Sequence, residues 1–174
     1  ANMVGVAAGL AAYGYKPIVV TFAPFATRRV CDQIAVSVAY AKQNVKIVGT
    51  DPGITAELNG GTHMSFEDIA TLRSIPTMTI YDAVDDTQVY QAIKQIMNTD
   101  GPCYIRMPRK AAQPVYDENY KFALNKADVI TKGNDITIVA SGIMVAESLK
   151  AVLKLKEEGI SAELISANTR KPLD

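Results

Sequence analysis

The regular alternation of short apolar runs with helical patterns is the feature that most constrains the fold of this chain. Runs typical of buried strands occur at four places: Pro17–Phe22, Val45–Val48, Met78–Tyr81 and Cys103–Met107. Strands that alternate with helices usually form parallel sheets, because each helix carries the chain back across a face of the sheet. We therefore expect an α/β fold with a doubly wound, mainly parallel sheet.

Helical patterns fill the intervals between these runs. The first, Ala1–Tyr13, has small residues at helical spacing, which indicate that another backbone approaches closely: Gly5, Ala8, Gly9 and Ala12. The next pattern begins near Phe25 and predicts one buried stripe: Val30, Ile34, Val38 and Ala41. Further helices are expected at Phe66–Arg73 and after Asp85, the latter with Val89, Ile93 and Ile96 on one face.

The alternation stops after the fourth strand run. Residues 110–124 include Pro114 and mixed polar residues without periodicity, a composition typical of an interdomain linker. The pattern then restarts with a strand at Ile136–Ala140, a helix ended by Gly159 and a strand at Ala162–Ile165. We expect one domain at 1–109, the linker, and the incomplete start of a second α/β domain at 125–174. The chain opens on Ala1 and holds a single βαβ unit after the linker, so we expect it to be part of a longer protein.

The loop after the second strand run gathers the polar residues that chemistry would use. It carries Asp51, Glu57 and Asn59, and it closes on His63, the only histidine of the chain. Ligands of open parallel sheets bind outside the carboxyl ends of the strands, where such a loop begins. Alternatively, His63 is simply a loop residue that caps the following helix.

Composition excludes several classes of function. The chain has 18 basic and 18 acidic residues, so its charge favours neither nucleic acid nor a membrane surface as a partner. No apolar run approaches the ~18 residues of a spanning helix. Two cysteines, in no metal-ligand spacing, indicate buried thiols and no metal site. We expect a cytoplasmic protein.

Familiar catalytic motifs are missing, but an aromatic corner is present. The sequence has no dinucleotide fingerprint, phosphate-binding Gly-rich loop, nucleophile elbow or Gly-Asp-Gly motif. Phe22 and Phe25 flank Pro24 at the end of the first strand run, where their rings could stack on a flat heteroaromatic ligand. The alternative is that both are core residues where the strand turns into a helix.

Five segments, taken in order, resemble the pyrimidine-binding domain of transketolase: Ala1–Ala11, Thr21–Phe25, Gly60–Ala70, Arg73–Pro76 and Tyr104–Arg109. The resemblance is closest to the carboxyl-terminal subunit of split transketolases. The restart after the linker is similar to the beginning of the third domain of that family. The resemblance implies thiamine diphosphate as the cofactor, with Phe22 and Phe25 on its aminopyrimidine ring and Arg28 where the family often has a tyrosine.

The same resemblance implies substrate contacts. His63 matches a histidine that lines the substrate channel beside the reactive carbon of the cofactor. Arg109 matches an arginine that binds the phosphate of a sugar phosphate, a role suited to a planar guanidinium. Asp51 and Asn59 lie where the family contacts substrate hydroxyls, and Asn59 replaces the commoner aspartate.

Two family features lie outside this sequence. The glutamate that activates the cofactor should directly precede Ala1, and the diphosphate with its Mg²⁺ or Ca²⁺ is held by another domain. We therefore expect a diphosphate-binding N-terminal half or subunit as a partner, in addition to a homodimer.

The expected activity is transfer of a two-carbon ketol unit between sugar phosphates, with this chain inactive on its own. One alternative is a deoxyxylulose-phosphate synthase, which shares the Thr-His turn and often has an aspartate at the position of Asp51. The other is a non-catalytic assembly domain that keeps the same fold.

Overall fold

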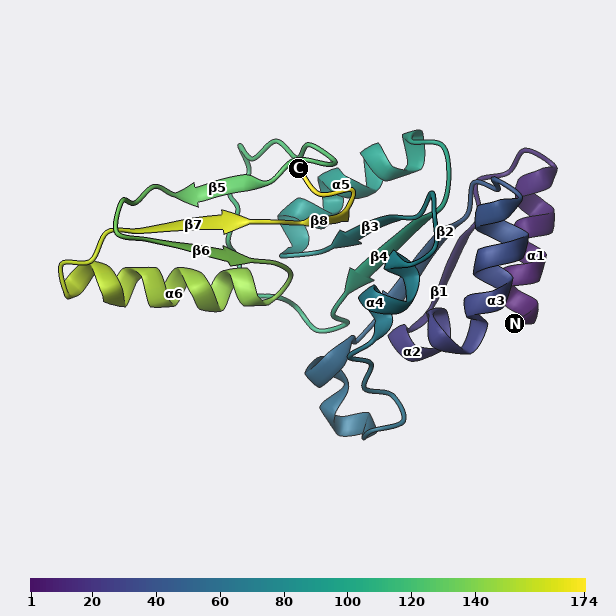
Figure 1. Cartoon of the computed structure of the whole chain (residues 1–174), viewed down its shortest axis with the longest axis horizontal. Helices are drawn as coiled ribbons and strands as arrows, with labels where there is room; N and C mark the ends of the chain where they lie inside the picture. The colour runs from purple at the N-terminus through teal and green to yellow at the C-terminus, as the bar shows by residue number, and fades with distance from the viewer.

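The computed structural model describes residues 1–174 and contains two sheets in one elongated molecule (Figure 1). The larger sheet has the strand order β1-β2-β4-β3-β8. Its strands are β1 (Ile18–Phe22), β2 (Lys46–Thr50), β3 (Thr79–Asp82), β4 (Cys103–Met107) and β8 (Thr169–Lys171). The first four are parallel, and β8 pairs antiparallel with β3. The predicted doubly wound, mainly parallel sheet is therefore confirmed.

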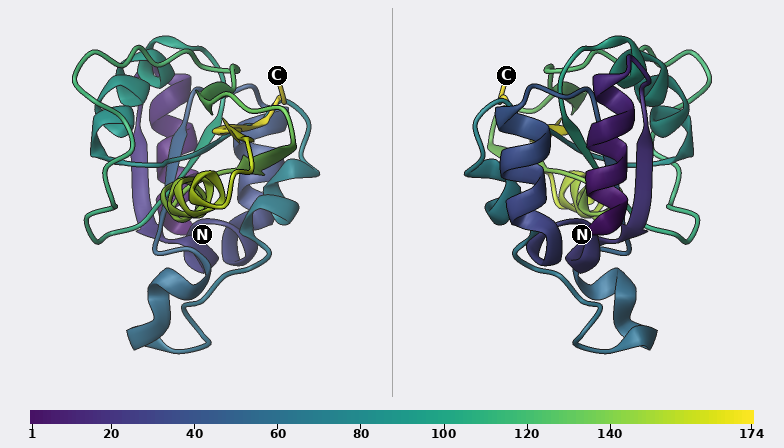
Figure 2. Two further views of the ribbon diagram at one scale, coloured as in Figure 1. Left: turned by 90° about the vertical axis from the view of Figure 1, so that its left-hand side faces the viewer. Right: turned by 90° about the vertical axis from the view of Figure 1, so that its right-hand side faces the viewer.

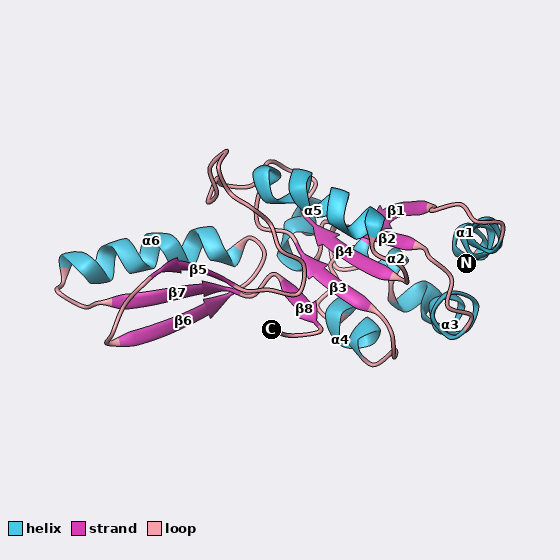
Figure 3. Ribbon diagram, turned by 90° about the horizontal axis from the view of Figure 1, so that it is seen from above, coloured by secondary structure: helices cyan, strands magenta, loops and turns pink.

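Helices cover both faces of this sheet (Figure 3). On one face, α1 (Asn2–Ala12) and α4 (Asp68–Arg73) pack over a core that includes Val19, Ile47 and Ile80. On the other face, α5 (Asp86–Asn98) packs over Val48, Tyr81 and Ile105. These two sets alternate along the strands, because successive strand residues point to opposite faces.

The helix expected after Phe25 is broken into four pieces. They are α2 (Ala23–Ala26), the 3₁₀ turn η1 (Arg28–Val30), α3 (Cys31–Gln33) and the π-helical segment η2 (Ile34–Tyr40). The expectation that Ala41 completes the buried stripe is wrong, because Ala41 is exposed and Ala39 is buried instead. A π segment bonds each residue to the fifth one along the chain, so its wider turn shifts the buried positions away from α-helical spacing.

The segment expected to be a linker has no helix or strand, yet it is bound along α5. Asp85 accepts hydrogen bonds from the Val115 and Tyr116 amides at 2.8 Å. Further along the helix, Gln91 and Gln95 accept hydrogen bonds from the Phe122 and Leu124 amides. The Phe122 ring is buried beside Tyr81. We call residues 110–124 the strap, because they run across α5 in fixed register.

The smaller sheet has the order β5-β7-β6, with one face covered by α6 (Met144–Glu157). Its strands are β5 (Asp128–Thr131), β6 (Ile136–Ala140) and β7 (Ala162–Ser166). The sequence pattern indicated β6, α6 and β7, whereas β5 and β8 were not predicted. The expected division into 1–109 and 125–174 remains a prediction, and β8 brings the end of the chain into the larger sheet.

Candidate functional site

The aromatic corner and the single histidine meet at the carboxyl edge of the larger sheet. Phe22 ends β1, Phe25 lies in α2, and His63 lies in the turn that follows the 3₁₀ segment η3 (Gly53–Asn59). The imidazole ring centroid is 4.9 Å from that of Phe22 and 5.0 Å from that of Phe25. Both contacts are edge-to-face, an arrangement that aromatic rings prefer. All three rings are half-buried, so part of the cluster is exposed to solvent.

Neighbouring strands bring Asp51 and Arg109 together at the same edge. Asp51 follows β2, Arg109 follows β4, and these strands pair directly. The Arg109 amide donates to Asp51 Oδ1 at 2.9 Å, and Arg109 Nε lies 3.0 Å from Oδ2, as an ion pair without hydrogen-bond alignment. Asp51 is buried with a φ of 50°, a left-handed conformation that Asp and Asn tolerate better than most residues.

Arg109 connects this pair to the aromatic rings. Its guanidinium carbon is 5.4 Å from the Phe22 ring centroid, and 54% of its side chain is exposed. A cation over an aromatic face is attracted by the ring, which helps to hold the guanidinium at the site. The two aromatic rings, the histidine and the Asp51–Arg109 pair therefore lie along one edge of the sheet.

Arg28 lies beside the turn that carries His63 and is not stacked on an aromatic ring. Its Nη1 is 3.0 Å from Glu67 Oε1, and its Nη2 donates to the Thr62 carbonyl at 3.5 Å. Partial burial acts to raise the pKa of Glu67. Nearby backbone N–H groups and Arg28 outweigh that effect and lower the pKa below its usual value. Arg28 thus joins the start of α4 to the His63 turn.

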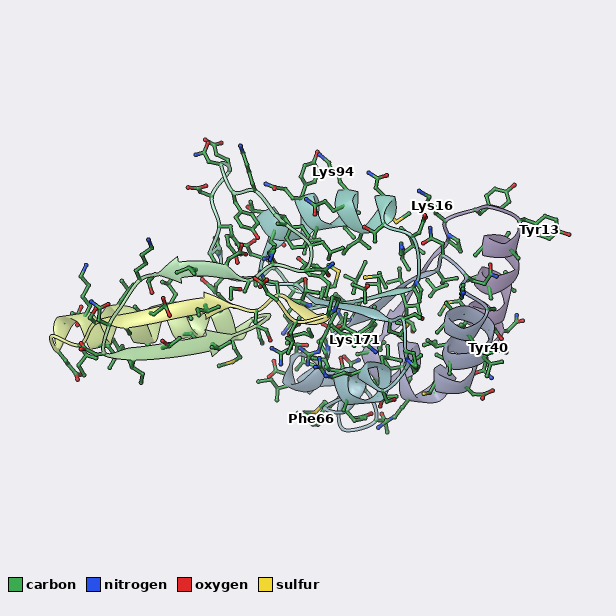
Figure 4. The ribbon with its side chains drawn as sticks, turned by 45° about the horizontal axis from the view of Figure 1, so that its top comes forward. Tyr13, Lys16, Tyr40, Phe66, Lys94 and Lys171 are labelled. Atoms are coloured by element: carbon green, nitrogen blue, oxygen red, sulfur yellow. The ribbon has the colours of Figure 1, made fainter.

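Asn59 is the predicted site residue that the structure does not join to the others. It ends η3, is exposed, and its side chain makes no hydrogen bond or ion pair. The segment that carries it projects from the body of the molecule, at the lower edge in Figure 2. Phe66, at the far end of the same loop, is also exposed and projects from the lower edge in Figure 4.

A buried charged network, not predicted from the sequence, lies behind this edge. Arg106 bonds to Asp68 at 2.8 Å and to Asp82 at 3.1 Å, and Tyr104 also donates to Asp68. Burial raises the pKa of Asp82, while Arg106 opposes that rise. The one sequence signal was an arginine inside the otherwise apolar β4, but nothing in the sequence identified its two partners.

The network reaches the end of β6 through Ser141, which directly follows that strand and donates to Asp82 at 2.8 Å. Gly142 follows with a φ of 55°, and a Cβ atom there would lie 2.7 Å from Asp82 Oδ1. Only glycine fits that turn without displacing the carboxylate. A cavity of about 270 Å³ lies in front of the network, with Arg106, Asp82, Ser141 and Met144 in its wall.

The sheet and this edge define a class: an α/β domain that carries a cluster of aromatic and basic side chains at the carboxyl ends of parallel strands, where ligands of such sheets bind. The family described as "Transketolase, pyrimidine binding domain" matches residues 1–114, and "Transketolase, C-terminal domain" matches residues 125–174. The chain belongs to the transketolase family.

Several relatives are subunits of divided enzymes. A 6-deoxy-6-sulfo-D-fructose transketolase subunit of Clostridium sp. (strain MSTE9) is 56% identical over 100% of this chain and 54% of its own length. One of the subunits of the apulose-4-phosphate transketolase of Phocaeicola vulgatus is 38% identical over 99% of this chain and 56% of its own length. This chain therefore spans about half the length of the curated relatives it matches.

Solved structures give the same family. One, described as "Split gene transketolase, inactive beta4 tetramer", has a TM-score of 0.91 at 37% identity and covers 99% of this chain and 56% of its own. Among the described residues, no helix is long and apolar enough to cross a membrane, and no group of three or more His, Cys, Asp or Glu is placed to hold a metal ion.

Proposed function

We propose that this chain is the C-terminal part or subunit of a cytoplasmic, thiamine-diphosphate-dependent transketolase, which moves a two-carbon ketol unit between sugars that carry an anionic end. The observation that carries the proposal is the meeting of His63, Phe22, Phe25 and Arg109 at one edge of the sheet. These residues come from three separate segments of the chain, so their meeting is a property of the fold.

The pyrimidine end of the cofactor fits the aromatic pair. Phe22 and Phe25 are half-buried with ring centroids 6.1 Å apart, and their open side can stack on a heteroaromatic ring. When bound, thiamine diphosphate supplies the carbanion chemistry of ketol transfer, and the protein supplies orientation and polar contacts. The diphosphate and its Mg²⁺ or Ca²⁺ are assigned to the N-terminal half.

The remaining residues would act on the substrate. His63, held on the aromatic pair and bonded through Nδ1 to the Thr62 hydroxyl at 2.9 Å, can hydrogen-bond a sugar hydroxyl or carbonyl oxygen beside the cofactor. Arg109 can bind the anionic end of the sugar with its outward N–H groups. Asp51 positions Arg109, and Asn59 would approach the sugar only from the projecting η3 segment.

The proposed partner is a diphosphate-binding N-terminal half or subunit, in a homodimeric arrangement of the complete site. The names of the relatives, which are subunits, support this division, as does the inactive tetramer named for the split-gene structure. The same names favour transketolase over a deoxyxylulose-phosphate synthase and over a non-catalytic domain.

A second candidate differs in the substrate alone. The 56% identical relative is named for a sulfonated fructose, whereas another is named for a phosphate ester. The proposed donor of this chain is therefore a ketose that ends in either a phosphate or a sulfonate group.

The test is reconstitution with the diphosphate-binding half, thiamine diphosphate and magnesium. Transfer of a ketol unit to an aldose acceptor should require both chains and the cofactor. His63→Ala should reduce this transfer strongly, while Tyr90→Ala, which removes an exposed ring from α5, serves as the control. Absence of transfer from every ketose tried, including an uncharged one, would overturn the proposal.

A further inference from the structure

We propose that the carboxylate of Asp51 makes this site selective for a singly charged sulfonate over a doubly charged phosphate at the end of the donor sugar. The inference rests on the proposed function and decides between its two substrate classes. It assigns Asp51 as a specificity-determining residue, not as a group that contacts the reacting carbon.

The first step is the position of the carboxylate. Asp51 is 1% exposed, and its Oδ2 lies 3.0 Å from the guanidinium that would bind the anion. Oδ2 accepts no hydrogen bond, and its ion-pair partner is Arg109. The Oδ1 bond to the Arg109 amide, together with the short strand-end turn, prevents the carboxylate from moving away.

The second step is the charge of the surrounding loops. Lys110 lies 3.6 Å from Glu57, and Arg28 lies 3.0 Å from Glu67, so each of these cations also has a carboxylate beside it. Arg29 is the exception, and it stacks on Phe25 with its guanidinium carbon 3.9 Å from the ring centroid. Apart from Arg29, these cations of the loops at the carboxyl edge are therefore each paired with a carboxylate, and each pair has a net charge near zero.

The third step is how binding depends on ligand charge. Attraction to a site rises in proportion to the charge of the ligand, whereas the cost of removing an ion from water rises with the square of its charge. A nearly neutral pair therefore compensates the desolvation of a monoanion better than that of a dianion. A sulfonate is singly charged at every relevant pH, whereas a phosphate monoester carries about −1.5 to −2 at pH 7, with a second pKa near 6. Both groups offer three oxygens to the outward N–H groups of Arg109.

The experiment uses the reconstituted two-chain enzyme and a matched pair of donors, fructose 6-phosphate and 6-deoxy-6-sulfofructose, with an uncharged ketose as reference. At pH 7.5 we expect kcat/KM to be at least tenfold higher for the sulfonate. Lowering the pH to 5.5 should reduce KM for the phosphate severalfold, relative to the sulfonate, because the phosphate becomes a monoanion.

Asp51→Asn supplies the decisive variant. Asparagine tolerates the left-handed backbone and keeps an oxygen for the Arg109 amide, but it removes the charge. The ratio of kcat/KM for the sulfonate to kcat/KM for the phosphate should fall at least tenfold, because KM for the phosphate donor decreases. Glu118→Gln is the control, because it removes one negative charge at an exposed position of the strap where no side-chain bond is lost.

The outcomes separate the two proposals. If the enzyme turns over the uncharged ketose but prefers phosphate at pH 7.5, or if Asp51→Asn leaves the ratio within twofold of the parent, the role of Asp51 is overturned and transketolase activity stands. If no ketose is turned over, the proposed function itself fails, and the inference fails with it.

Discussion

At the scale of single residues, Arg106 has the most demanding environment in the chain. Its side chain is 21% exposed, and the guanidinium bonds to two carboxylates whose side chains are 1% and 4% exposed. Removing one member of a buried ionic cluster lowers the free energy of unfolding by more than the intact cluster adds to it, because the remaining charges stay buried without a partner. Arg106 is therefore a structural residue, although it lies only three positions before Arg109.

We predict that Arg106→Met destabilises the chain by about 3 to 5 kcal/mol at pH 7. Burial already raises the folded-state pKa of Asp82 above its usual value, and without the Arg106 cation that pKa rises further. Stability of the variant should then recover as the pH falls through that raised pKa and the Asp82 carboxyl becomes neutral. Urea unfolding at pH 7 and pH 5 measures both effects.

Ser141→Ala is the matched control for this network, since it removes a neutral donor to Asp82 and should cost only ~1 kcal/mol. A loss of stability in Arg106→Met that stays constant between pH 7 and pH 5 would contradict the explanation by uncompensated charge.

A second residue-scale prediction concerns Arg109. In the reconstituted enzyme, Arg109→Ala should raise KM about tenfold or more for donors with an anionic end, as expected for the loss of a charge-assisted contact worth ~1.5 to 3 kcal/mol. An uncharged ketose should be affected much less. Steady-state kinetics on both donors decides the point, and equal losses on the two would rule out an anion-binding role.

At the scale of elements, α1 carries an uncovered face. Met3, Val6 and Leu10 are between 40% and 54% exposed, and an added Cβ at Gly5 or Gly9 would contact nothing within the chain. Ala8, grouped with those glycines from the sequence, is buried against the core instead. Figure 4 shows Tyr13 projecting outward from the end of this helix. The small residues of α1 predicted that another backbone approaches this helix closely. On the uncovered face, that backbone would have to belong to a second chain.

Gly9→Leu tests this face. The new side chain meets no atom of the same chain, and it raises helix propensity, so the fold should be retained. Self-association should nevertheless weaken, because the leucine would hold the second backbone away. Sedimentation equilibrium measures the self-association. Lys154→Leu, at an exposed position of α6, is the control for added apolar surface. A parent chain that stays monomeric at high concentration would contradict the idea.

Whether an element could be predicted from the sequence depends on whether the residues that determine it lie within the element or elsewhere in the chain. The strands β1 to β4 and the helices α5 and α6 carry their own periodic patterns, so the sequence indicated them. By contrast, β8 is three residues long and exists because β3 offers it an open edge. The strap likewise depends on Asp85, Gln91 and Gln95, which no local pattern connects to residues 115–124.

The features of the site likewise divide into those that the sequence could identify and those that depend on contacts between distant segments. Phe22, Phe25, His63 and Arg109 could be named from motifs that resemble the family, and the structure brings them to one edge. The pairing of Asp51 with Arg109, the contact of Arg28 with Glu67 and the whole Arg106 network join segments 24 to 59 residues apart. Such contacts are set by strand order, which the sequence pattern does not specify residue by residue.

At the scale of the whole molecule, the chain contains candidate contacts for only one end of the cofactor. Stacking on Phe22 and Phe25 would supply ~1 to 3 kcal/mol, compared with ~4 kcal/mol for millimolar binding. We predict that the isolated chain binds thiamine diphosphate no better than millimolar and transfers no ketol unit until the diphosphate-binding half is added. Calorimetry with the cofactor and magnesium measures the affinity, and a micromolar dissociation constant would show that the metal and diphosphate site has been misassigned.

The position of β8 also bears on how the molecule folds during synthesis. The edge of β3 is completed by residues translated about ninety positions later, after every strand of the smaller sheet. Because domains tend to fold as they leave the ribosome, the larger sheet must wait with one edge unpaired while the rest of the chain is made. An unpaired edge is a template for intermolecular pairing, so nascent chains that pause between residues 107 and 169 would be the ones most exposed to aggregation and most dependent on chaperones.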